Sequence, residues 1–204
     1  MTHEPDLKKI PVTLLLILVN VCLFLWFFIT GDPGDGAFML SRGAASYQLI
    51  EGGEIWRLFT SMFLHFSAEH LLSNMLSLFA LGCIIEDRFG HGRFLFIYLL
   101  SGLFGGLASF FWHRFLMLDA VCAGASGAVF GLDGALLIMA LFGSTARYGV
   151  DKRRVPLAVL LTVVLSAQQN VDNAAHIGGL LAGALLSFVL TLADRGRKDT
   201  NNVL

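Results

Sequence analysis

The chain of 204 residues is too apolar and too poorly charged to be an ordinary soluble domain. Hydrophobic residues make up 56% of it and charged residues 14%, whereas soluble domains average about 45–50% and about 25%. With a mean hydropathy of +0.73, this composition excludes a disordered chain and indicates a membrane protein. The net charge of −1 leaves no basic excess with which to bind nucleic acid.

Six mostly apolar stretches are candidates for membrane spans, which need about 20 apolar residues each. The first carries no charge and is longer than the core of a signal peptide, and no cleavage site of small residues follows it. We therefore expect it to be retained as a helix. The fifth is short and has Pro156 near its start. The six stretches cover residues 10–30, 69–85, 94–112, 125–142, 155–167 and 174–192.

The distribution of Lys and Arg between the connecting segments predicts the orientation of the chain in the membrane. If the N-terminus is cytoplasmic, only Arg42, Arg57 and Arg114 of the 14 basic residues fall outside. We therefore expect both termini in the cytoplasm. The expected organisation is a short N-terminus (1–9), a six-span domain (10–192) and a short, polar, frayed tail (193–204), with no soluble domain attached.

The connection between the first two spans, residues 31–66, is too long for a simple turn. It includes the run 55–59, in which Trp56 and Arg57 stand among apolar residues. Long connections are often functional or re-entrant, and adjacent Trp and Arg side chains suit the membrane interface. Trp56 and Arg57 are therefore expected either to anchor this loop at the interface or to handle a substrate.

Polar side chains inside membrane spans are costly, so each one marks a candidate site. Even-numbered spans run from outside to inside, so they begin near the outer face. His70, Asn74, Ser126 and His176 all lie within about two turns of such a beginning. At about 1.5 Å per residue they share one depth. The sequence therefore places four polar residues from three spans in one layer just below the outer surface.

The fourth and sixth spans also carry small residues at four-residue spacing, which lets helix backbones approach closely in lipid. Ser126 and His176 each adjoin one of these positions. If the two spans pack along them, the Ser126 hydroxyl comes within reach of the His176 ring. The repeated positions are Gly127 and Gly131 in the fourth span and Ala175, Gly179 and Gly183 in the sixth.

A serine beside a histidine is an arrangement for nucleophilic catalysis, because a base must remove the hydroxyl proton. Ser126 begins a predicted helix, where free backbone N–H groups favour a developing oxyanion. His70 and Asn74 are spaced i,i+4, so they share a helix face, and both can donate hydrogen bonds. No third acid is evident, which indicates a Ser-His dyad. Taken singly, Ser126 could be a helix cap and the other three could tie helices together.

At these residues the sequence resembles the rhomboid family of intramembrane serine proteases. The resemblance covers about residues 10–192, and its motifs occur in order on the predicted helices. These motifs are Trp56-Arg57, His70-x-x-x-Asn74, Glu86-Asp87-Arg88-Phe89-Gly90, Gly124-x-Ser126-Gly127 and Ala175-His176-x-x-Gly179-x-x-x-Gly183.

The resemblance implies an all-α membrane protein, a six-transmembrane-helix bundle with a long, partly embedded first loop and a water-filled cavity open to the outer side. It implies a serine endopeptidase that hydrolyses a peptide bond in or next to the transmembrane helix of a membrane-protein substrate, without metal or cofactor. The first loop then resembles the family's lateral element, and the fifth span its substrate gate. The expected setting is a lipid bilayer, the inner (plasma) membrane of a bacterium.

The resemblance also implies a role for individual residues. Ser126 is the nucleophile and His176 the general base and later the acid. His70, Asn74 and the Ser126 backbone N–H resemble the family's oxyanion donors, and Gly124 belongs to its GxSG loop. The family often has Tyr four residues after the nucleophile, where this chain has Phe130. We expect the Phe130 ring still to stack on His176, without the hydroxyl.

Two other functions compete with proteolysis. A non-catalytic rhomboid-like binder of transmembrane helices would lack the nucleophile or the base, and this chain has both. A transporter or channel is suggested by Asp133 and the intramembrane histidines, but the two halves show no convincing repeat. Asp133 lies seven residues after Ser126, on a similar face and about 10 Å deeper. We expect it to be a protonated or hydrogen-bonded structural group.

No metal site is expected from the sequence. His65, Glu69 and His70 do not have HExxH spacing. Cys122 is interpreted as a packing residue near the outer rim, and the three cysteines form neither a disulfide framework nor a CxxC pair. The charged residues 86–88 are expected to fix a cytoplasmic loop.

Overall fold

The computed structural model describes residues 7–143, 145–166 and 172–201, and these residues are almost entirely helical. The described residues contain no strand; an isolated antiparallel bridge joins Ala45 to Cys122. The all-α class expected from the sequence is therefore confirmed. The α-helices are α1 (Pro11–Thr30), α2 (Gly36–Ser41), α3 (Tyr47–Glu51), α4 (Arg57–Thr60), α5 (Ala68–Phe89), α6 (His91–Leu116), α7 (Ser126–Phe142), α8 (Val155–Ser166) and α9 (Asn173–Asn201), and three short 3₁₀ turns are η1 (Leu7–Lys9), η2 (Ser61–Phe63) and η3 (Ala146–Tyr148).

Among the described residues, four helices are long and apolar enough to cross a membrane: α1, α5, α6 and the Asn173–Gly196 part of α9. The other two apolar helices are shorter, with 17 residues in α7 and 12 in α8. At 1.5 Å per residue, α7 extends about 26 Å and α8 about 18 Å, against a hydrocarbon core of about 30 Å. Length therefore identifies four clear span candidates among the six expected stretches.

Helix α1 shows the reversed polarity of a membrane helix. Its polar side chains Thr13 and Asn20 are fully buried, whereas the large apolar Leu18 and Phe28 are 58% and 66% exposed. A soluble helix would bury the apolar face and expose the polar one. The outward face of α1 is suited to lipid, and the protein is an integral membrane protein.

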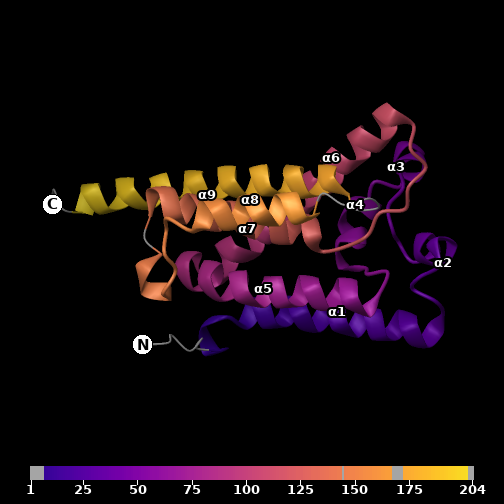
Figure 1. Ribbon diagram of the computed structural model, residues 1–204, viewed down its shortest axis with the longest axis horizontal. Helices are drawn as coiled ribbons and strands as arrows, with labels where there is room; N and C mark the ends of the chain where they lie inside the picture. Colours follow the sequence, from indigo (N-terminus) through magenta and orange to yellow (C-terminus); the bar gives the residue numbers. More distant parts are fainter. Residues whose placement is uncertain (1–6, 144, 167–171, 202–204) are drawn as a thin grey trace.

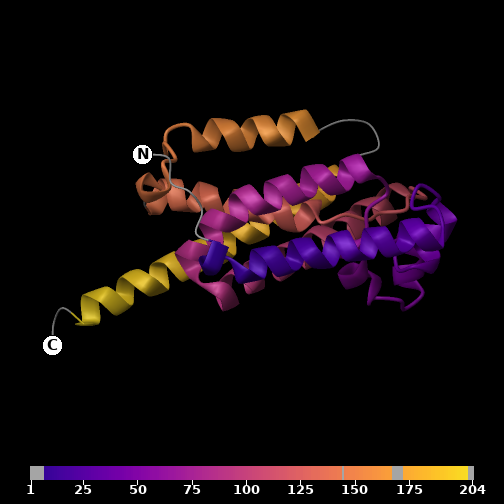
Figure 2. The same cartoon turned by 90° about the horizontal axis from the view of Figure 1, so that it is seen from below.

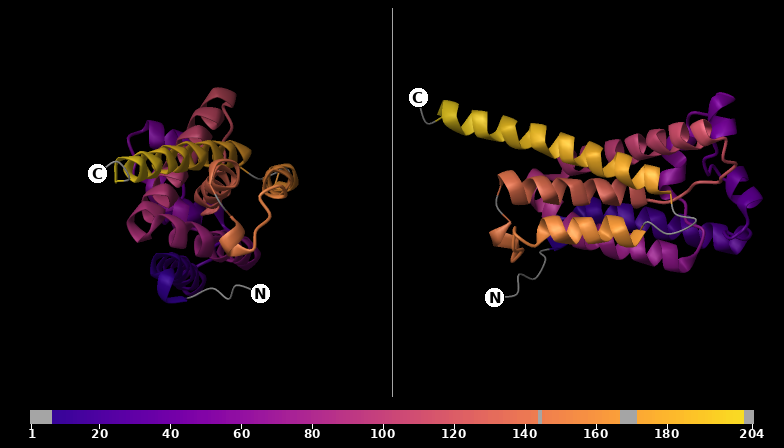
Figure 3. Two further views of the ribbon diagram at one scale, coloured as in Figure 1. Left: turned by 90° about the vertical axis from the view of Figure 1, so that its left-hand side faces the viewer. Right: turned by 45° about the horizontal axis from the view of Figure 1, so that its top comes forward.

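The helices that carry the candidate polar residues begin at one end of the molecule. Figure 1 shows the first turns of α5, α7 and α9 at the end where the short helices α2, α3 and α4 gather, opposite the end of α9. Helices α6, α7 and α9 pack against one another, and the most extensive contact of α7 is with α9. Figures 2 and 3 show α8 at the edge of the bundle, where its buried Val155 and Val159 pack against Ala140 of α7.

The close approach of α7 and α9 depends on glycine. A Cβ atom added at Gly179 would come within 1.9 Å of the Gly127 carbonyl oxygen, and one added at Gly183 within 1.9 Å of the Gly131 oxygen. These distances leave no room for a side chain. The packing predicted from the small residues is therefore present in the structure.

A buried carboxylate joins the beginning of α1 to the end of α5. Glu86 is 1% exposed, and its oxygens accept hydrogen bonds from the backbone N–H groups of Val12 and Thr13 at 2.9 and 2.7 Å. The Thr13 hydroxyl donates at 2.6 Å, and the His91 ring lies 2.7 Å away. Asp87 and Arg88 extend the contacts to η3 and α9 through Tyr148, Arg147 and Asp194. The network expected from residues 86–88 thus joins helices as well as a loop.

Two segments differ from the sequence prediction. Residues 193–201 continue α9, so the expectation of a frayed tail from residue 193 was wrong. Ion pairs from Asp194 to Arg88 and Arg93 bind this extension to neighbouring helices. The connection between α1 and α5, expected as a loop, contains α2, α3, α4 and η2. The predicted fifth span ends at residue 167, which lies outside the described residues.

Candidate active site

Ser126 and His176 meet at the ends of two helices. Ser126 is the first residue of α7, and His176 lies in the first turn of α9. The Nε2 atom of His176 lies 2.9 Å from the Ser126 Oγ, a distance at which the ring can accept the hydroxyl proton. The other ring nitrogen, Nδ1, has no hydrogen-bond partner among the described residues. The structure therefore brings the Ser126 hydroxyl and the His176 ring together without a third described side chain hydrogen-bonded to the ring.

The ring of Phe130 lies flat against the His176 imidazole. The ring centroids are 4.1 Å apart and the planes differ by 9°. Phe130 stands one turn after Ser126, so α7 carries both the hydroxyl and the aromatic surface that holds the imidazole. The stacking expected from the sequence is present, without a phenolic hydroxyl.

Gly124 brings His70 close to the serine. Its φ of +146° is a backbone conformation that favours glycine, and a Cβ there would lie 2.9 Å from the His70 Cε1 and Nε2 atoms. The Gly124 N–H donates to the Ser61 carbonyl at 2.9 Å, which fixes the loop. Glycine is thus required at position 124 both by backbone conformation and by the His70 ring.

Asn74 lies one turn below His70 and is 5% exposed. Its Nδ2 donates to the His70 backbone carbonyl at 3.0 Å. This bond uses one of two amide hydrogens, so one donor is left for another acceptor. His70 and Asn74 therefore share a face of α5, as their spacing predicted.

His65 is a neighbour of the site that was not among the site residues expected from the sequence. It is 1% exposed, and its ring meets that of His70 edge to face, with centroids 5.0 Å apart. Burial, followed by the adjacent His70, lowers its pKa from 6.5 to about 3, while the Phe63 backbone opposes the change. His65 is therefore neutral near pH 7, and its ring packs against the His70 ring.

Arg57 and Trp56 have different environments. The buried Arg57 guanidinium donates to the Leu40 and Ala44 carbonyls, each at 2.7 Å, and to the Glu54 carboxylate at 2.8 Å. It also lies 4.6 Å from the centre of the Trp56 ring. Through these contacts Arg57 holds together distant parts of the segment between α1 and α5. Trp56, 49% exposed, is the member of the pair that can meet lipid or substrate.

Asp133 stands apart from these contacts. It is half-buried in α7, two turns after Ser126. No hydrogen bond or ion pair connects its side chain to another described residue. A hydrogen-bond partner for the Asp133 carboxyl is therefore not found among the described residues. Asp133 also makes no contact that positions Ser126 or His176.

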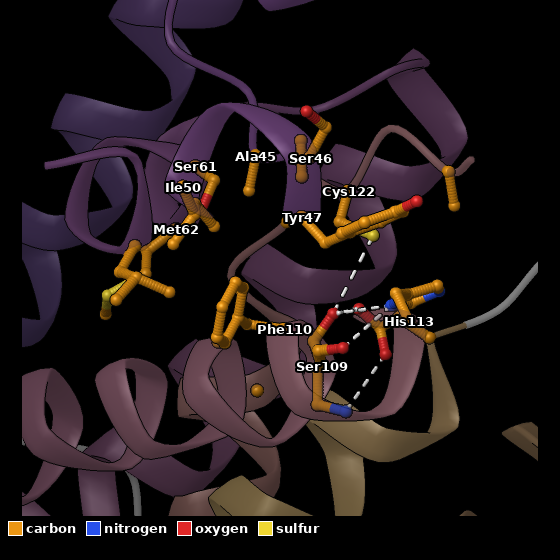
Figure 4. Close-up of a pocket in the computed structure, with 18 of the residues that line it drawn as sticks. Ala45, Ser46, Tyr47, Ile50, Ser61, Met62, Ser109, Phe110, His113 and Cys122 are labelled. Carbon is orange, nitrogen blue, oxygen red and sulfur yellow. Dashed lines mark hydrogen bonds between the residues drawn. The ribbon is translucent and has the colours of Figure 1, made fainter. Parts of the chain in front are cut away.

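A cavity of about 60 Å³ opens beside the serine, lined by residues of α3, α4, η2, α6 and α7 and of the loops before α7 and α9. A water molecule needs about 10–15 Å³, so the cavity holds several. Ser126 and Gly124 line one part of it. Figure 4 shows a second polar group on its wall, formed around Ser109, His113 and Cys122.

The fold and the site together define a class of protein: a helical membrane protein with a serine and a histidine paired between two apolar helices. Residues 52–193 match the family model of the Rhomboid domain. The chain belongs to the rhomboid family, as the resemblance in its sequence predicted.

Several relatives show how far this similarity extends. The chain is 35% identical over 189 residues to rhomboid protease GluP of Bacillus subtilis, covering 90% of this chain and 36% of that protein. It is 33% identical over 219 residues to rhomboid protease AarA of Providencia stuartii, covering 96% and 78%. It is 40% identical over 152 residues to RHOMBOID-like protein 5 of Arabidopsis thaliana, covering 74% and 48%. The chain therefore spans about a third, three quarters and half of these relatives.

Proposed function

We propose that this protein is a serine endopeptidase that cleaves a peptide bond in or next to the transmembrane helix of a membrane-protein substrate. The observation that carries the proposal is the 2.9 Å contact between the Ser126 Oγ and the His176 Nε2. Both residues lie within the matched Rhomboid domain, and two of the relatives carry the name rhomboid protease.

The proposed reaction begins when the Ser126 oxygen attacks the carbonyl carbon of the scissile bond and its proton passes to His176 Nε2. The oxyanion accepts hydrogen bonds from the Ser126 backbone N–H, which is free because it begins a helix, and from His70 and Asn74. His176 then protonates the leaving amine. A water from the cavity, activated by the same ring, hydrolyses the acyl-enzyme.

Cleavage of a tagged transmembrane substrate in liposomes tests this proposal. We expect Ser126→Ala to lower the rate at least about a thousandfold, because neither the dyad nor an acyl-enzyme can form. Ser41→Ala, which changes an exposed serine of α2, is the matched control and should cleave like the wild type. Equal cleavage by wild type and Ser126→Ala would overturn the proposal.

A fluorophosphonate probe provides an independent measurement of the nucleophile. Labelling should require Ser126 and fall sharply in His176→Ala. If the probe labels nothing while transmembrane helices bind to the protein, the non-catalytic binder becomes the better description. The intact contact between the two side chains favours the enzyme.

We further propose that all six apolar helices cross the membrane, with both chain ends in the cytoplasm and the dyad near the outer face. The common end at which α5, α7 and α9 begin supports this arrangement (Figure 1). The domain boundaries are then 1–9, 10–192 and 193–204. The peripheral α8, which contacts the bundle through few side chains, is the proposed substrate gate. The bacterial relatives GluP and AarA favour a bacterial plasma membrane.

A further inference from the structure

Four polar side chains from distant parts of the sequence converge at the outer end of the cavity. Ser109 and His113 belong to the last turns of α6, Cys122 to the loop before α7, and Asp172 directly precedes α9. One atom each from His113, Cys122 and Asp172 lies within 4.8 Å of the other two. Figure 4 shows the contacts of the Ser109 hydroxyl with His113 and Cys122.

The Ser109 hydroxyl stands at the centre of this cluster. It donates to the Asp172 carboxylate, and it lies 3.2 Å from the His113 Nδ1 and 3.8 Å from the Cys122 Sγ. The hydroxyl donates its one proton to Asp172 and can act only as an acceptor toward the other two groups. The three outer groups surround this hydroxyl, and a cation bound beside it would contact one ligand atom from each of them.

We propose that His113, Cys122 and Asp172 form a binding site for a zinc ion beside the catalytic cavity. Imidazole, thiolate and carboxylate are the ligands that zinc takes in proteins, whereas magnesium and calcium prefer oxygen alone. Bonds of about 2.0–2.3 Å in a tetrahedron place ligand atoms about 3.3–3.8 Å apart. The ligand atoms lie no more than 4.8 Å apart, so small movements of the side chains bring them to bonding distance, and the fourth position goes to water or to Ser109.

Two proton changes accompany binding. The Cys122 thiol gives up its proton to water on coordination, because the thiolate is the form that binds the ion. The His113 Nδ1 lies 2.9 Å from the Ser109 carbonyl and donates to it. Coordination through Nδ1 requires the tautomer protonated on Nε2.

The proposed ion would act on the dyad through Asp172. The Asp172 Oδ1 accepts from the Ala175 N–H at 3.0 Å, and its backbone carbonyl accepts from the His176 N–H at 3.2 Å. Asp172 thus holds the turn of α9 that carries His176. An ion on its carboxylate would hold this turn against α6 and take up space in the cavity that Ser126 lines. We infer that zinc slows the peptidase, an inference that rests on the proposed function.

Cobalt binding to the full-length Ser126→Ala protein in detergent tests the site without any activity. We expect one cobalt ion per chain and a thiolate-to-cobalt charge-transfer band that zinc displaces. Cys122→Ala in the same background should lose the band and bind zinc at least about tenfold more weakly. Cys83→Ala, which removes a thiol of α5, is the matched control. Absence of the band, or an unchanged band in Cys122→Ala, would overturn the proposal.

Thermal unfolding separates an ion site from a hydrogen-bonded cluster. In the proposed site, zinc raises the melting temperature of both the wild type and Ser109→Ala, because the three ligands remain, but not that of Asp172→Asn. In a purely hydrogen-bonded cluster, Ser109→Ala melts at a lower temperature than the wild type. Zinc then raises the melting temperature of none of the three proteins. Size-exclusion chromatography verifies that each variant is folded.

The cleavage assay compares the rate of each protein in the presence of zinc with its own rate in the absence of zinc. Zinc should inhibit the wild type at least about tenfold, reversibly by a chelator, and leave His113→Gln within about twofold. Cleavage by the wild type that does not change with zinc, despite cobalt binding, would overturn the inhibitory role alone. No cleavage under any condition would instead count against the proposed function, while the cobalt spectrum would still report the site.

Discussion

The orientation of His176 is the residue-scale feature on which the proposed chemistry depends. Its Nε2 must face the Ser126 hydroxyl, yet its Nδ1 has no hydrogen-bond partner among the described residues to hold it. In a triad, a carboxylate on Nδ1 orients the ring. We propose that the flat contact with Phe130 takes over that function and that Phe130 is a positioning residue.

Phe130→Ala should lower kcat about tenfold with little change in KM. A stacked ring pair contributes about 0.5–1.5 kcal/mol, and its loss frees the imidazole to rotate away from the hydroxyl. Phe130→Tyr keeps the ring and should retain at least about half of the wild-type kcat. Steady-state cleavage of a transmembrane substrate provides both constants. If Phe130→Ala turns over like the wild type, another contact orients His176.

The sequence predicted some members of the site and not others, for a physical reason. Ser126 and His176 could be paired from the sequence because small residues beside both imply a close helix contact. His65 was not expected at the site because a five-residue separation does not place two side chains on one helix face; in the structure His65 precedes α5, and a bend at residues 66–67 brings its ring against that of His70. The group around Cys122 was missed because its members have no common spacing.

At the scale of elements, the contact between α7 and α9 sets the distance between Ser126, the proposed nucleophile, and His176, the proposed base. The backbones approach so closely that Gly179 faces the Gly127 carbonyl oxygen, with room for hydrogen alone. Any side chain at this contact must push the helices apart. Because Ser126 and His176 stand on opposite sides of the same contact, the displacement reaches the dyad directly.

Gly179→Ala should destabilise the protein by about 1–3 kcal/mol and abolish most of the cleavage. Gly196→Ala is the matched control on the same helix, because a Cβ there meets nothing within 4 Å, and it should cleave like the wild type. Thermal unfolding in detergent and the cleavage assay measure the two effects. Full activity in Gly179→Ala would show that the dyad does not depend on this contact.

The helical elements themselves were largely predictable, while their ends and connections were not. The apolar stretches matched the helices from α5 to α8 within a few residues because burial in lipid dictates a continuous apolar run. The extension of α9 depends on Asp194 pairing with Arg88 and Arg93, which are distant in sequence. The short helices between α1 and α5 depend on Arg57 binding carbonyls far along the loop.

At the scale of the whole molecule, the charge distribution predicts which surface faces the cytoplasm. Ser41 and Lys152 are both exposed and lie in α2 and in the connection between α7 and α8. In a variant without Cys22, Cys83 and Cys122, we expect an impermeant maleimide to label Ser41→Cys on intact cells. Lys152→Cys should be labelled only after permeabilisation, because basic segments stay inside. The reverse pattern would invert the proposed topology.

Stability of the whole fold should fall in mild acid because His65 is buried without a charge. Its pKa is about 3 in the folded protein and 6.5 when exposed. Above pH 6.5 both states are neutral and His65 has no effect. Between the two values only the unfolded chain binds the proton, so the free energy of unfolding decreases by up to about 1.4 kcal/mol per pH unit.

Thermal unfolding of the wild type and His65→Leu from about pH 7 to pH 4.5 tests this linkage. The substitution itself changes the packing, so the quantity to compare is the slope of stability against pH, not stability at one pH. We expect a steeper decline in the wild type, by about 2 kcal/mol at pH 5. Parallel curves for wild type and His65→Leu would mean that His65 takes up its proton equally in both states.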